Sequence, residues 1–73
     1  MEPLPLFKAL TDRASEAEIE AAAGELIRDA HASALCRETR LMLAENYLRE
    51  AAALDGPRAT ALRWAANSLR SEA

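Results

Sequence analysis

The chain runs for thirty-one residues, from Glu25 to Asp55, without a glycine or a proline. Ala, Leu, Glu and Arg dominate this run, and these residue types have the strongest intrinsic preference for the α-helix. The whole chain contains no valine and little threonine, so residues that favour β-strands are scarce. The sequence therefore predicts an all-α protein.

With 73 residues, the chain is expected to form one helical domain over residues 1–73. Eighteen positions are alanine, which removes little apolar area from water when it is buried. A chain this short also buries a small fraction of its surface, so a core of its own is only marginally stabilising. We therefore expect the protein to associate with itself or with a partner.

Local signals divide the chain into four helices, over residues of about 5–12, 16–33, 37–54 and 57–71. Pro3 and Pro5 favour an extended approach to the first helix, and Pro5 suits a first helical turn. Ser15 followed by Glu18 is a capping box, in which the two side chains accept hydrogen bonds from backbone amides at a helix start. Gly56 followed by Pro57 predicts that one helix ends and the next begins there.

The middle of the chain allows two interpretations. An apolar stripe in residues 16–34 stays in helical phase with Leu41, Ala44, Leu48 and Ala52, as it would on one continuous helix over 16–54. Such a helix would be about 60 Å long, which is too long for a compact monomer of this size. Arg37 falls within the stripe, while Leu35 and Met42 fall on the opposite side. We therefore predict a turn between Ala32 and Arg37 and a central antiparallel hairpin, with the continuous helix as the alternative.

The helix over 37–54 has a wider apolar arc than a helix with one neighbour needs, because Leu43, Tyr47 and Leu54 flank its stripe. The favoured interpretation is a central helix that contacts two others. The alternative is that the row of Leu43, Tyr47 and Leu54 binds a partner or a second copy, since tyrosine suits half-exposed positions.

In the last helix, Leu62, Ala65, Ala66 and Leu69 form a stripe that is expected to face the core. The opposite face carries a tryptophan beside arginine, which is the composition of an interaction hot spot. Alternatively, Trp64 folds back with Ala61 onto Phe7 of the first helix. The residues expected on this outer face are Thr60, Arg63, Trp64, Asn67 and Ser71, with Arg70 at its edge.

The sequence contains few side chains that could catalyse a reaction or bind a metal. His31 and Cys36 are its soft metal ligands and its one nucleophile–base combination, and their spacing puts them on different faces of a helix. We therefore expect no catalytic residue, no metal, no other cofactor and no small-molecule substrate. Cys36 is expected to be a small buried side chain and His31 a residue at the boundary with solvent.

These features predict a non-enzymatic module that binds another protein or a second copy, as a small adaptor, co-chaperone, inhibitor or anti-activator. The alternative is a nucleic-acid-binding regulator that uses Arg58, Arg63, Asn67 and Arg70. A net charge of −3 weighs against nucleic acid and against an anionic membrane. A single cysteine, no secretory signal and no long apolar segment favour the cytoplasm.

Overall fold

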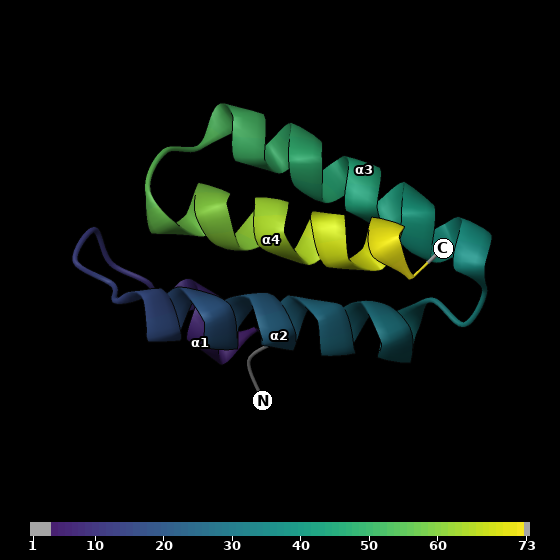
Figure 1. Cartoon of the computed structure of the whole chain (residues 1–73), viewed down its shortest axis with the longest axis horizontal. Helices are drawn as coiled ribbons and strands as arrows, with labels where there is room; N and C mark the ends of the chain where they lie inside the picture. The colour runs from purple at the N-terminus through teal and green to yellow at the C-terminus, as the bar shows by residue number, and fades with distance from the viewer. Residues whose placement is uncertain (1–3, 73) are drawn as a thin grey trace.

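A computed structural model of the chain describes residues 4–72, so Pro3 lies outside the described residues. This part contains four helices and no strand: α1 (Pro5–Lys8), α2 (Glu16–Ser33), α3 (Arg37–Ala53) and α4 (Pro57–Ser71), as Figure 1 shows. The all-α architecture is therefore confirmed. Within residues 4–72, none of the helices combines the length and the apolar character that crossing a bilayer requires.

The capping box forms at the start of α2. The hydroxyl of Ser15 accepts a hydrogen bond of 3.2 Å from the backbone amide of Glu18. The Glu18 carboxylate accepts one of 3.2 Å from the backbone amide of Ser15. Two amides that lack a partner within the helix are thereby satisfied, and α2 begins at Glu16.

A turn separates α2 from α3, so the continuous helix is excluded and the predicted break is confirmed. Ala34 has an extended backbone, with φ −128° and ψ 99°. Arg40 then stabilises the turn, since its Nη1 donates to the carbonyl oxygens of Ala34 at 3.0 Å and Leu35 at 3.1 Å. The role of Arg40 was not predicted, because it depends on the path of the turn.

The first helix is shorter than the predicted 5–12, because α1 ends at Lys8. Thr11 starts a turn there: its hydroxyl accepts from the Arg13 amide at 3.3 Å and its carbonyl oxygen from the Ala14 amide at 3.0 Å. Threonine competes with helical hydrogen bonds in this way. Leu4, between the two prolines, has φ 55° and ψ 52°, so the expected extended approach to α1 is wrong at this residue.

The central helix is α4, which runs between α2 and α3 and packs against both (Figure 1). The expectation that helix 37–54 takes this place is therefore wrong. The hairpin arms α2 and α3 are antiparallel, but they meet each other at few points. The distance between two packed helix axes depends on the size of the side chains at the contact. Small alanine side chains therefore let α4 pack closely between α2 and α3. The buried alanines of α4 are Ala59, Ala61, Ala65 and Ala66.

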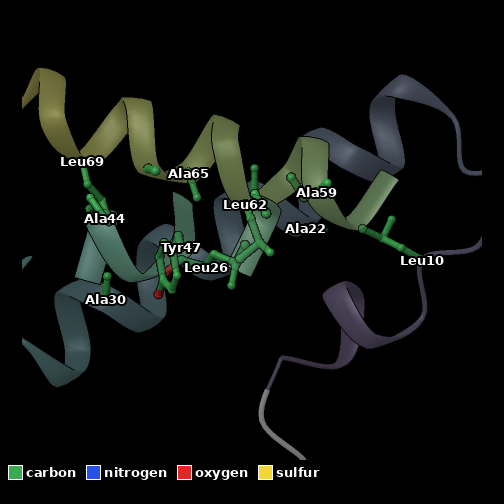
Figure 2. Packing of buried hydrophobic residues seen from close by; sticks show 14 residues of the cluster. Leu10, Ala22, Leu26, Ala30, Ala44, Tyr47, Ala59, Leu62, Ala65 and Leu69 are labelled. Atoms are coloured by element: carbon green, nitrogen blue, oxygen red, sulfur yellow. The ribbon is translucent and has the colours of Figure 1, made fainter. Parts of the chain in front are cut away.

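The core collects the largest fully buried side chains, Leu26, Leu62 and Leu69, among many alanines (Figure 2). Its α3 face consists of Ala44, Tyr47 and Ala51. Ala52, which the continuous stripe placed in the core, is exposed. The turn at residues 34–36 is the reason, since it interrupts the helical phase that the stripe assumed.

Gly56 has φ 79° and ψ −154° and is the N-cap residue of α4. It does not end α3 as expected, because α3 ends at Ala53 and Leu54 is already extended. A backbone of this shape is essentially restricted to glycine. The connection between α3 and α4 therefore depends on Gly56.

We expect Gly56→Ala to lower the free energy of unfolding by about 1–3 kcal/mol. Strain is the reason, since an added Cβ would make only an ordinary contact of 3.7 Å with Asp12 Oδ1. Gly24→Ala is the matched control, because Gly24 lies inside α2, where its Cβ would also have ordinary room. The control should gain about 0.5–1 kcal/mol. Urea unfolding of both variants measures the difference, and equal effects would contradict the strained conformation.

Candidate interaction surfaces

The fourth helix has two distinct faces. Its inner face is buried, as predicted for Leu62, Ala65, Ala66 and Leu69. Its outer face carries the expected polar and aromatic side chains, which are Thr60, Arg63, Trp64, Asn67, Arg70 and Ser71. Thr60 is half-buried, and the others are exposed. These residues lie three or four positions apart and are therefore neighbours on the helix surface. The outer face of α4 is the candidate interaction surface.

Trp64 is the apolar centre of this face. Its side chain keeps 36% of its area exposed, whereas Ala61 is fully buried. Arg63 precedes it, and Asn67 follows one turn later; both are exposed. An exposed indole beside a guanidinium gains most when a partner removes both from water. The four α4 residues predicted to bind a partner are thus together on one exposed face: Arg63, Trp64, Asn67 and Arg70.

The second predicted row, Leu43, Tyr47 and Leu54, does not form one surface. Tyr47 is only 9% exposed and belongs to the core, so its expected position on an open surface is wrong. Its hydroxyl donates to the Leu26 carbonyl oxygen over 3.5 Å. Leu43 is half-buried against the core, and Leu54, beyond the end of α3, is 41% exposed.

The surroundings of Tyr47 also change its acidity. Burial raises the pKa of the Tyr47 phenol above its usual value, and the negative charges of Asp29 and Glu50 raise it further. The phenol therefore stays protonated and keeps its role as a donor.

Two charged side chains hold α1 in place, a role that the sequence did not predict for either of them. The Glu25 carboxylate accepts hydrogen bonds from the backbone amides of Leu6 at 3.0 Å and Phe7 at 2.8 Å. Arg58 donates from Nη2 to the Lys8 carbonyl oxygen at 2.9 Å. Both ends of the short helix are thus satisfied from other helices. No local pattern signals these contacts, because their partners are distant in the sequence.

His31 lies at the surface, as expected, and its Nε2 is 2.9 Å from Glu72 Oε2. This contact joins the last turn of α2 to the residue that follows α4. Within residues 4–72, no three His, Cys, Asp or Glu side chains are grouped as a metal site would require.

Cys36 is exposed, so the expectation that it is a small buried side chain is wrong. The reason is its position at the turn before α3, where it is the N-cap residue. Its Sγ lies 2.9 Å from the Thr39 hydroxyl. This hydrogen bond is the main cause that lowers the pKa of the Cys36 thiol.

We expect Cys36 to react with iodoacetamide at pH 7 faster than an unstructured cysteine, because a lowered pKa raises the thiolate fraction. Thr39→Val should slow the reaction at pH 7 and leave it nearly unchanged at pH 10, where both thiols are ionised. The rate measured against pH gives the pKa of each variant. Identical rate profiles would contradict the role of Thr39.

Two apolar side chains near the turn are the most exposed of their kind in the described part, Leu35 at 87% and Met42 at 64%. In the sequence, both residues indicated only the turn. Their position off the apolar stripe was the available signal that they face solvent. A shallow open depression lies at the same end of α3, lined by Cys36, Arg37, Glu38 and Leu41.

The fold and these surfaces define a small all-α helical protein whose last helix has a buried face and an exposed face with a tryptophan. Comparison of the chain with family models, curated proteins and solved structures found no match.

Proposed function

We propose that this chain is a non-enzymatic protein-binding module that acts as a small adaptor, co-chaperone or inhibitor through the outer face of α4. The observation that carries the proposal is the position of Trp64, 36% exposed beside exposed Arg63 and Asn67 on a helix whose other face forms the core. Large aromatic side chains left on a surface are typical anchors of protein interfaces.

The contacts of the two reactive side chains support a non-enzymatic role. His31 faces Glu72, whereas Cys36 faces Thr39 on the other side of the turn. They do not form the nucleophile–base pair that covalent catalysis needs. The single cysteine also favours the cytoplasm as the place of action, since it cannot form an internal disulfide.

Nucleic acid is the alternative binding partner, and the contacts of the arginines weigh against it. Arg58 donates to the Lys8 carbonyl oxygen, so it is engaged within the protein. Arg63 and Arg70 remain on the outer face of α4, in a chain of net charge −3. Phosphate binding depends on many such contacts and weakens steeply with salt.

Affinity capture with the tagged full chain tests the proposal. Wild type, Trp64→Ala and Leu35→Ala are compared, and a captured protein is then purified and titrated against each variant. Leu35→Ala is the control, because it removes a more exposed apolar side chain away from α4. We expect Trp64→Ala alone to lose the partner. Equal binding by all three proteins, or loss only with Leu35→Ala, would contradict the proposal.

A further inference from the structure

The outer face of α4 is positively charged. From Pro57 to Ser71 the helix contains no acidic residue, and its exposed cations on this face are Arg63 and Arg70. These two residues are seven positions apart, which is about 10 Å along a helix. Trp64 and Asn67 lie between them. A matching surface therefore needs two negative charges about 10 Å apart with an apolar side chain between them.

The outer face of α3 has this pattern. Glu38 and Glu45 are exposed and also seven positions apart, and Met42 between them is 64% exposed. The core side of the same helix is formed by Ala44, Tyr47 and Ala51, which places the three outer residues away from the core.

Another acidic pair has the same spacing but lacks the other features. Glu18 and Glu25 lie seven positions apart on α2, with alanine and glycine among the residues between them. Glu25 is half-buried, and its carboxylate binds the amides of Leu6 and Phe7. In the described part of the chain, the α3 face alone combines free carboxylates at this spacing with a large exposed apolar side chain.

The charges on both faces have no ionic partner within residues 4–72. The ion pair in this part joins His31 and Glu72. Arg63, Arg70, Glu38 and Glu45 are therefore available to an external surface.

We propose that the outer face of α4 binds the outer face of α3 of a second copy of this chain, with the two helices antiparallel. In this register Arg63 faces Glu45, Arg70 faces Glu38, and Met42 falls opposite the stretch between Trp64 and Asn67, next to the indole. Sulfur–aromatic contacts of this kind are favourable. Arg49 lies one turn beyond Glu45 and falls opposite Ala59, one turn beyond Arg63. The inference rests on the proposed function, because it names what occupies the Trp64 face.

A symmetric contact between two α4 helices is disfavoured, because it would bring Arg63 and Arg70 of both copies together. The proposed contact joins two different surfaces and is therefore heterologous, so its repetition gives a ring or an open chain. Solvent-exposed ion pairs contribute little each, which makes the contact weak and dependent on salt.

Charge reversal tests the register. One variant carries Arg63→Glu and Arg70→Glu, and another carries Glu38→Lys and Glu45→Lys. Sedimentation equilibrium at low and high salt measures the average mass of each variant and of their equimolar mixture. We expect wild type to exceed the mass of one chain as concentration rises. Each variant alone should associate at least about tenfold more weakly, and the mixture should recover association because both contacts are complementary again.

A matched control separates this register from general charge attraction. Glu16→Lys with Glu20→Lys makes the same charge change on exposed positions of α2. Because both proposed faces are unaltered in this variant, it should associate like wild type. Weakening by this control as large as that caused by the α3 reversal, a monomeric wild type at all concentrations, or association unaffected by either reversal would overturn the inference. If the second-copy contact is not found but capture of another protein still requires Trp64, the proposed function stands.

Discussion

Leu62→Ala is expected to lower the free energy of unfolding by about 2–5 kcal/mol, because it leaves a cavity in a small core. Leu62 is 1% exposed and lies on α4, the helix that contacts both α2 and α3. Figure 2 shows its side chain directed to the side of α4 where Leu26 and Tyr47 lie. A loss of this size is a large part of the stability of a small domain.

Chemical denaturation followed by circular dichroism measures the loss. Leu35→Ala is the control, since it removes the same atoms from a side chain that is 87% exposed. The control should change the free energy of unfolding by less than about 0.5 kcal/mol. If both variants unfold at the same denaturant concentration, α4 is not the central helix of the core.

Trp64→Ala is expected to weaken partner binding by about 2 kcal/mol or more, the usual cost of losing a hot spot. Its cost in folding stability should be about 1–2 kcal/mol, below the 3–5 kcal/mol of a fully buried tryptophan. The difference follows from the 36% of the side chain that remains in contact with water. The two quantities are measured by calorimetric titration with the partner and by denaturation of the free variant.

A different balance between the loss of partner binding and the loss of folding stability would change the assignment of Trp64 to the interface. Loss of most of the stability, or a variant that does not fold, would place Trp64 in the core. Unchanged binding by a folded variant would move the interaction away from α4. Leu54 would then be the exposed member of the other predicted row, since Tyr47 is buried.

The starts of α2 and α4 were readable from the sequence because each depends on neighbouring residues. Ser15 and Glu18 form their capping box within one turn, and Pro57 opens the next helix. The two faces of α4 were also predicted, since a helix without interruption keeps its phase from Leu62 to Leu69. Local chemistry was sufficient in both cases.

The order of the helices in space was not readable, because it depends on contacts between distant residues. Nothing near Ala61 or Ala65 in the sequence indicates that α4 enters between α2 and α3. Tyr47 was placed beside the apolar stripe rather than on it because α3 was given the phase of α2, and the turn at residues 34–36 cancels that phase. Arg58 was counted as a free cation because its acceptor, the Lys8 carbonyl oxygen, is fifty positions away.

The fluorescence of Trp64 tests the central claim most directly, since it is the one tryptophan of the chain. Acrylamide is a neutral quencher, so nearby arginines do not bias its access. In the folded protein at a dilution where it is monomeric, we expect substantial quenching, less than in the urea-unfolded chain, and a marked decrease when the binding partner is added. A folded monomer in which acrylamide barely quenches the emission, or a complex in which quenching is unchanged, would contradict the assignment of Trp64 to the interface.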